Sequence, residues 1–380
     1  MNRCFDGVNL RLARVFHALA LEDVAERVDK SRQYLHKLET GRAIPTDELA
    51  AQLAAVLSVE TDFFYQQGTP PLNEELYHFR KLLTTRSGIK QVAMAKAEMF
   101  RRLVDLLDSL LRLPAVAFPT VERVTTPDDI ELAAERCRSE WGLGWGPIAN
   151  TIRVAERAGV LVTTFRQVSQ EVDALSISAR RPFIVLNEAK GSACRQRFDM
   201  AHELGHFVMH EGVLTGDRKT ENEANRFAGA FLMPRAMMAK LFPRPRGTRL
   251  DWAGIREFKM HWKVSKAAIL YRARQLGLIT DEQYTSGLIN LKRNGEAIRE
   301  REDDAIEWER PELVESASQL LQRTKGWDLA AFGKQLLVKT SVLVDILPTL
   351  AQSTASPVAP AGAQVLDFST LRAQRHNLDS

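Results

Sequence analysis

Two histidines lie four residues apart in the stretch H-E-L-G-H, from His202 to His206. An α-helix turns by about 100° per residue, so both imidazoles project from one face, about 6 Å apart along the axis, and can reach one metal ion. Glu203 does not share their direction. It is therefore free to take a proton from a water molecule that the metal activates and to pass it to a leaving amine. The pattern requires a helix here and indicates a hydrolytic metal site; the alternative is a histidine pair satisfied within an ordinary core.

A third protein ligand is expected on the next stretch, T-E-N-E-A-N-R-F-A-G-A-F-L-M-P. Thr220 and Glu223 have the spacing of a capping box, which would give Glu223 a structural task at the start of a helix. Glu221 is then the carboxylate left for the metal. Small residues on its face would let this helix pack tightly against the histidine helix, and Asn225, one turn on, is placed to orient the carboxylate.

Two further residues of the histidine helix predict how it is packed. His210 lies about 12 Å along the axis from His202, too far to complete the same site, so we expect it to form a hydrogen bond in the core. Gly205 costs about 1 kcal/mol of helix propensity relative to alanine, which we interpret as a place where something approaches the backbone closely.

Length, charge and cysteines limit the class of protein. A chain of 380 residues predicts two or three domains, and a net charge of +4 means that any polyanion must be bound by a local basic surface. Three widely separated cysteines without a C-x-x-C pair predict a reducing cytosol. The N-terminus has no apolar signal core and the chain has no run of 18 apolar residues, so we expect a cytoplasmic protein with no membrane partner.

Residues 8–65 show a series of short amphipathic helices. The stretch L-E-D-V-A-E-R-V-D-K-S-R-Q-Y-L-H-K-L-E-T-G-R-A-I-P resembles the Cro/cI-type (XRE) helix-turn-helix, including its Glu-x-Gly ending at Glu39 and Gly41. The resemblance implies a recognition helix over residues 31–38 that enters the major groove, with Leu35 and Leu38 facing the core.

The expected DNA contacts cluster around this helix. Residues 1–66 hold eight basic and ten acidic residues, but residues 30–42 hold four basic and one acidic, so affinity for a double-stranded operator would depend on a narrow strip. The alternative is a helical module that binds protein. The side chains expected to read bases or bind phosphates are Lys30, Ser31, Arg32, Gln33, Lys37 and Arg42.

The remaining pattern predicts a mainly α, α+β protein. Residues 89–113 form one long amphipathic helix that either packs on its own domain or dimerises. Three strands are expected in G-V-L-V-T-T-F, A-L-S-I-S and P-F-I-V-L-N-E, the last as an edge that accepts a peptide. A second helix-turn-helix-like stretch lies between Asp251 and Gly277 and includes W-K-V-S-K-A-A-I-L-Y-R-A-R-Q-L-G. Its basic residues could contact DNA or substrate, but we interpret it as helices that close over the active-site side. The expected segments are 1–68 for DNA binding, 69–125 for the linker and long helix, 126–292 for the metal domain, 293–350 for a helical extension, and 351–380 for a disordered tail.

The stretches R-F-D-M-A-H-E-L-G-H-F-V-M-H and E-N-E-A-N-R-F-A-G-A-F-L-M-P together resemble the ImmA/IrrE family of zinc metallopeptidases, over residues 130–291. The resemblance implies a zincin-like α+β domain with Zn²⁺ held by His202, His206 and Glu221, and with Glu203 as general base. Mn²⁺ or another divalent ion can also occupy such sites. Family members cleave regulatory proteins, often repressors.

We therefore expect a homodimeric transcription regulator with a zinc-dependent endopeptidase domain, which cleaves a repressor-type protein in a stress, phage or toxin–antitoxin response. The alternative is a non-enzymatic DNA-binding regulator or antitoxin, whose metallopeptidase-like domain senses a ligand or partner. An intact Glu203 favours the enzyme, because a degenerate site would tolerate its loss.

Overall fold

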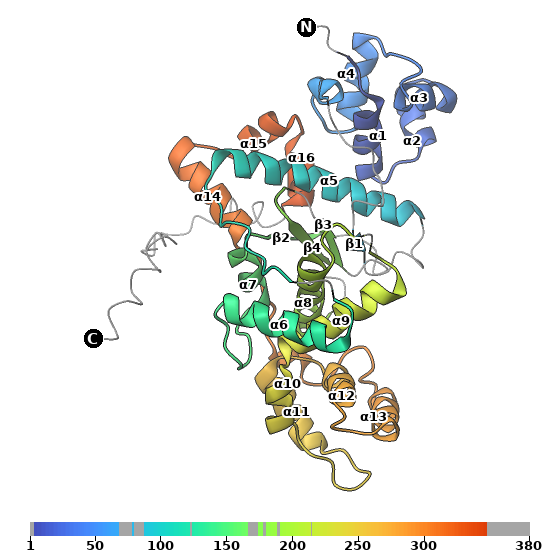
Figure 1. The fold of residues 1–380 in the computed structure, drawn as a ribbon. Helices are drawn as coiled ribbons and strands as arrows, with labels where there is room; N and C mark the ends of the chain where they lie inside the picture. Colours follow the sequence, from blue (N-terminus) through green and yellow to red (C-terminus); the bar gives the residue numbers. More distant parts are fainter. Residues whose placement is uncertain are drawn as a thin grey trace, which may run out of the picture.

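The computed structural model describes residues 4–67, 78–79, 87–121, 124–165, 174–177, 180–187, 191–213 and 215–347. The expected tail over 351–380 lies outside these residues. Figure 1 shows an N-terminal group of helices, a small sheet between two helical layers, and a group of helices at the opposite end. Within the described ranges, no helix is long and apolar enough to cross a membrane.

The N-terminal domain is built from short helices whose ends follow the expected caps. The Ser31 hydroxyl accepts a hydrogen bond from the Tyr34 amide (3.2 Å), and the Thr46 hydroxyl accepts one from the Leu49 amide (3.3 Å). The elements are α1 (Gly7–Phe16), α2 (Leu21–Arg27), α3 (Arg32–Glu39), α4 (Asp47–Val56) and the 3-10 helix η1 (Thr61–Tyr65).

The Glu-x-Gly ending of α3, the expected recognition helix, has a structural role. Glu39 accepts two hydrogen bonds from Arg14 of α1 (2.5 and 2.9 Å), and Gly41 ends the helix region with a φ of +69°. Leu35 and Leu38 are fully buried, as expected. The end of α3 packs so closely on α1 that a Cβ on Gly7 would lie 2.2 Å from the carbonyl oxygen of Leu38. These contacts fix the orientation of α3.

The three expected strands form, and a fourth, two-residue strand joins them. The strand order is β1-β3-β4-β2, in which β2 and β4 are parallel and the other pairs are antiparallel. The stretch P-F-I-V-L-N becomes β4, which pairs on both sides, so its expected role as a peptide-accepting edge is wrong. The strands are β1 (His78–Phe79), β2 (Leu161–Phe165), β3 (Ala174–Ile177) and β4 (Phe183–Asn187).

Both faces of the sheet are buried, each in a different core. In β4, Phe183 and Val185 lie in one hydrophobic cluster, whereas Ile184 and Leu186 lie in the other. Side chains alternate between the two faces of a strand, so this division places the sheet between two helical layers. The chain is thus mainly α, with a small mixed sheet at its centre.

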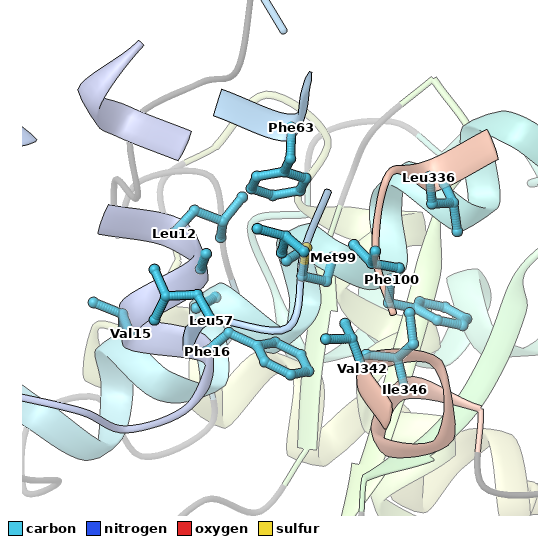
Figure 2. Close-up of a cluster of buried hydrophobic side chains, with 14 of the residues drawn as sticks. Leu12, Val15, Phe16, Leu57, Phe63, Met99, Phe100, Leu336, Val342 and Ile346 are labelled. Carbon is cyan, nitrogen blue, oxygen red and sulfur yellow. The ribbon is translucent and has the colours of Figure 1, made fainter. Parts of the chain in front are cut away.

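The first layer joins the N-terminal domain to the sheet. The long helix α5 (Ser87–Leu110) packs against α1 and α16, and Figure 1 shows it crossing between the N-terminal helices and the sheet. Figure 2 shows the shared core, where side chains of the N-terminal domain meet Met99 and Phe100 of α5 and residues of the last two helices. The C-terminal helices are α14 (Leu313–Lys325), α15 (Leu329–Leu336) and α16 (Thr340–Ile346).

A backbone link ties the chain's last helices to the N-terminal domain. The amide of Glu60 donates to the carbonyl of Leu337 (2.8 Å), and the amide of Lys339 donates to the carbonyl of Ser58 (2.9 Å). The expected segment boundaries remain predictions, but the described core contains residues of the N-terminal domain, α5, the sheet and the C-terminal helices together.

The second layer covers the opposite face of the sheet. Helix α8 packs against both β3 and β4, and α9 packs against α8 and α6. This layer consists of α6 (Pro127–Glu140), α7 (Thr151–Arg157), α8 (Ala193–Met209) and α9 (Arg218–Leu232).

The second helix-turn-helix-like stretch forms α11 and α12 in the group at the end opposite the N-terminal domain. Two of its lysines do not face solvent: Lys259 is fully buried against Glu300 and Asp303 (2.6 and 2.5 Å), and Lys266 pairs with Glu296 (2.6 Å). These cations are therefore not available to DNA. The elements here are α10 (Arg235–Leu241), α11 (Trp252–Trp262), α12 (Lys266–Gln275), α13 (Asp281–Arg293) and the 3-10 helix η4 (Asp303–Ala305).

Candidate metal centre

Three side chains from α8 and α9 converge on one point. The Nε2 atoms of His202 and His206 are 3.1 Å apart, and each lies 3.4 Å from an oxygen of Glu221. A tetrahedral ion with ligand distances of about 2.0–2.2 Å separates its ligand atoms by about 3.3–3.6 Å. The three donors therefore fit around a single divalent ion, and together they form the candidate metal site in the described part of the chain.

The surroundings of His206 and Glu221 set the charge states that a metal requires of these two donors. Burial lowers the pKa of His206 to about 4, so its imidazole is neutral at neutral pH. For Glu221, burial raises the pKa, but the two imidazoles lower it more strongly, and the pKa falls to about 2. A neutral imidazole and an ionised carboxylate are the ligand forms that bind a divalent ion.

The glycine of H-E-L-G-H brings the two helices together. A Cβ on Gly205 would lie 2.9 Å from Cδ1 of the buried Phe227 ring on α9. The expected close approach at Gly205 is thus the approach of α9, the helix that carries Glu221.

The start of α9 differs from the expected capping box. Asp217 caps the helix, accepting hydrogen bonds from the amides of Lys219 (2.6 Å) and Thr220 (3.1 Å). Thr220 is thus inside the helix, and the expected capping task of Glu223 is wrong. The earlier aspartate satisfies the free amides and releases Glu223 for another contact.

Asn225 contacts the metal site, but through a different ligand from the one expected. Its Oδ1 lies 3.0 Å from Nδ1 of His202, not against Glu221. An acceptor at Nδ1 holds a hydrogen there and leaves Nε2 free to bind a metal. Asn225 therefore orients His202.

Glu203 follows the ligand His202 on α8 and is almost completely buried, with an exposed fraction of 1%. The hydroxyl of Ser176 on β3 donates a hydrogen bond to its Oε2. Sequence reasoning missed Ser176, which is fully buried on the central sheet. The available signal was a lone serine inside an apolar strand.

The six expected DNA-binding side chains all lie on the exposed side of the N-terminal domain. Arg32 forms an exposed ion pair with Glu22 of α2 (2.6 Å), and Ser31 uses its hydroxyl oxygen as the cap of α3. Tyr34 is partly buried and packs on the core instead of protruding from the helix. The exposed set is Lys30, Ser31, Arg32, Gln33, Lys37 and Arg42.

Two histidines and a glutamate on neighbouring helices, with a second glutamate beside them, are the arrangement of a metallopeptidase. Comparison with protein families agrees: residues 155–274 match the IrrE N-terminal-like domain, a peptidase family, and residues 10–64 match a helix-turn-helix family. The chain thus carries an N-terminal helix-turn-helix DNA-binding domain of the XRE type and a metallopeptidase-like domain. No curated protein matches the chain.

Proposed function

We propose that this protein is a transcription regulator in which the IrrE-like domain is a zinc-dependent endopeptidase that cleaves a regulatory protein, a repressor-type target, in a stress, phage or toxin–antitoxin response. The observation that carries the proposal is the donor triangle of His202, His206 and Glu221, with the buried Glu203 next to His202 on the same helix. Zn²⁺ is the expected ion, since two imidazoles and a carboxylate are a common zinc set, although Mn²⁺ can occupy it.

In the proposed reaction, Glu203 acts as general base and then as general acid. A divalent ion held at the site would polarise the substrate carbonyl and lower the pKa of the attacking water. Glu203 would accept a proton from that water and deliver it to the leaving amine. Ser176 holds the carboxylate in position, and burial of Glu203 excludes bulk water from this transfer.

The described sheet suggests where an extended substrate would lie. Strand β3 packs against α8 and carries Ser176, which contacts the proposed catalytic carboxylate. The edge of β3 that faces away from β4 is therefore close to this carboxylate. Strand β1 already pairs there in the antiparallel direction, with His78 opposite Ser176. This edge therefore accepts a segment of extended chain, and a substrate would pair alongside or in place of β1.

For the DNA-binding end, we propose that Arg32, Gln33 and Lys37 read bases, and that Lys30, Ser31 and Arg42 bind phosphates of an operator. Two observations support this assignment. All six side chains are exposed on α3 and its flanking turns, and the contact between Glu39 and Arg14 holds α3 in place. Arg32 would exchange its exposed partner Glu22 for a base.

The deciding experiment for the peptidase is Glu203→Gln. The variant keeps the shape of the side chain, so zinc content, measured by mass spectrometry of the metal, and operator affinity should stay unchanged. Cleavage should be abolished, because an amide cannot accept the proton. New N-termini in a cell extract treated with wild-type protein, and missing with the variant, identify the substrate.

His202→Ala is the matched comparison, because it should remove zinc and cleavage together. A Glu203→Gln strain with a full transcriptional response to the inducing stress would contradict the proposal. That result would favour the non-enzymatic sensor.

The DNA assignment is tested with an operator selected in vitro from random sequence. Gln33→Ala should cost about 1–3 kcal/mol and relax the preference at one base pair, since Gln33 is proposed to read a base edge. Lys30→Ala should weaken binding to all sequences alike and reduce the salt dependence by about one ion. Identical behaviour of the two variants would contradict the division into base and phosphate contacts.

A further inference from the structure

A chain of polar contacts leads away from the metal site on the His206 side. Nδ1 of His206 lies 2.9 Å from Nδ1 of His210, one turn along α8. Nε2 of His210 in turn lies 2.9 Å from Oε2 of Glu223 on α9. Both histidines are buried, with exposed fractions of 2% and 4%. The expected core hydrogen bond of His210 is thus a link between a metal ligand and a carboxylate.

The chain has one consistent arrangement of hydrogens when His206 binds a metal. Nε2 of His206 faces His202 and Glu221, so it must carry the lone pair, and the hydrogen is on Nδ1. That hydrogen is donated to Nδ1 of His210, which therefore carries its own hydrogen on Nε2. Glu223, an acceptor only when ionised, receives this second hydrogen. Each link fixes the tautomer of the next.

We propose that Glu223 is a positioning residue for the metal site, which acts through His210 to hold His206 in the tautomer and ring orientation that present Nε2 to the ion. This inference rests on the proposed metal site but does not require that the protein cleave peptides. It also gives the two imidazoles different supports, a neutral amide of Asn225 for His202 and a carboxylate relay for His206. A carboxylate raises the basicity of the imidazole it supports, so His206 is the stronger of the two donors.

The surroundings of Glu223 offer a matched control. Its other oxygen, Oε1, lies 3.8 Å from Nζ of Lys219, whose side chain is 73% exposed. Lys219→Ala therefore alters the charge beside Glu223 without breaking the relay. If Glu223 acted only through surface electrostatics, Lys219→Ala and Glu223→Ala would change zinc affinity by similar amounts in opposite directions.

The experiment measures zinc affinity of the full chain by competition with a chelator. Glu223→Ala should weaken zinc binding about 10- to 100-fold, the usual effect of losing a partner of a ligand. Glu223→Gln should lose less, since its amide oxygen still accepts a hydrogen bond, though a neutral one. Lys219→Ala should bind zinc as the wild type does.

A double-mutant cycle tests the relay itself. His210→Phe removes the acceptor for His206 and should weaken zinc binding about as much as Glu223→Ala. The double variant should be no weaker than either single one, because both changes break one chain. Additive losses would overturn the proposal. So would an unchanged zinc affinity in Glu223→Ala accompanied by an equal fall in melting temperature with and without zinc, which is the result for a merely structural residue.

Nitrogen-15 spectra of labelled histidines in the zinc-saturated protein give a readout besides affinity. The wild type and Glu223→Gln should show His210 with its hydrogen on Nε2 and hydrogen-bonded to residue 223, and Glu223→Ala should lose that hydrogen bond. If Glu223→Ala does not fold, Glu223→Gln and His210→Phe still decide. A wild type that binds no zinc would refute the metal site, whereas a wild type that binds zinc no more tightly than Glu223→Ala would refute only the relay.

Discussion

At the scale of single residues, Gly205 shows how the metal site depends on close packing between α8 and α9. Gly205→Ala adds a methyl group 2.9 Å from the Phe227 ring, and the ring is fully buried. Because a buried phenyl ring cannot move aside freely, we expect a loss of about 1–3 kcal/mol in unfolding free energy, although alanine is the better helix former. Urea denaturation of the zinc-free protein measures it.

Gly229 of α9 is the matched control for this substitution. A Cβ there would meet Cδ of Arg272 at 3.5 Å, an ordinary contact. Gly229→Ala should therefore stabilise the protein by up to about 1 kcal/mol through helix propensity alone. Equal stabilities for the two variants would contradict the packing argument.

The identities of the candidate ligands could be read from the sequence, but their supporting contacts could not. The spacing of His202 and His206 fixes their common face in any α-helix. The contacts of Asn225 and Glu223 depend on the angle at which α9 crosses α8, and on Asp217 taking the cap. Ser176 comes from a strand distant in sequence, so no local pattern connects it with Glu203.

At the scale of elements, Glu156 joins α7 to the start of α14. Its Oε1 accepts hydrogen bonds from the amides of Glu312 (2.8 Å) and Leu313 (2.7 Å), which are free at a helix N-terminus. Burial nevertheless raises the pKa of Glu156 to about 7, outweighing the backbone hydrogen bond and Arg153. Ionisation of this carboxyl group thus lowers the unfolding free energy of the protein.

This raised pKa predicts a pH dependence. The pKa of Glu156 is higher in the folded state (about 7) than its usual 4.5. The protonated carboxyl therefore contributes its full share of the unfolding free energy below pH 4.5, and this share is lost as the pH rises through 7. Glu156→Gln keeps an acceptor oxygen without the charge. The variant should match the wild type at pH 4.5 and exceed its unfolding free energy by up to about 3 kcal/mol at pH 8.

Denaturation curves at both pH values check this, with Glu307→Gln, at an exposed carboxylate, as the control for losing one charge. A stability difference between Glu156→Gln and the wild type that does not change with pH would contradict the assignment.

Helices and strands were predictable where their periodicity is strong. The long helix α5 and strands β2, β3 and β4 follow apolar patterns that are local in sequence. Strand β1 has only two residues and no pattern of its own. The interior place of β4 follows from the order of strands in the sheet, which the hydrophobic pattern does not contain.

At the scale of the whole molecule, the DNA-binding domain is part of a larger core. Arg102 of α5 donates to Oδ1 of Asn9 (2.6 Å) and to Oε1 of Gln66 (2.7 Å), and its guanidinium lies 4.5 Å from the centre of the Phe63 ring. The sequence suggested a domain followed by a linker. It could not show this packing, because the contacts join residues about 36 to 93 positions apart.

Cutting the chain between the N-terminal domain and α5 tests this integration. A protease site inserted within residues 68–77 should, after cleavage, leave two fragments that elute together in size-exclusion chromatography, since the apolar core and Arg102 still join them. Arg102→Ala should weaken their association at least several-fold, because it leaves buried Asn9 without this donor.

Arg112→Ala, at an exposed arginine just beyond α5, is the control and should have no effect. If the two fragments separate after cleavage even when Arg102 is present, the N-terminal domain is held to the rest of the protein by the linker alone.

The pairing of residues 337–339 with residues 58–60 predicts the effect of mutations that truncate the chain. A premature stop codon after α13 would spare the whole histidine motif and the whole recognition helix. It would nevertheless strip the apolar cover from one face of the sheet and from part of the N-terminal domain. Late nonsense alleles of this gene should therefore behave as complete nulls, not as regulators with a shortened tail.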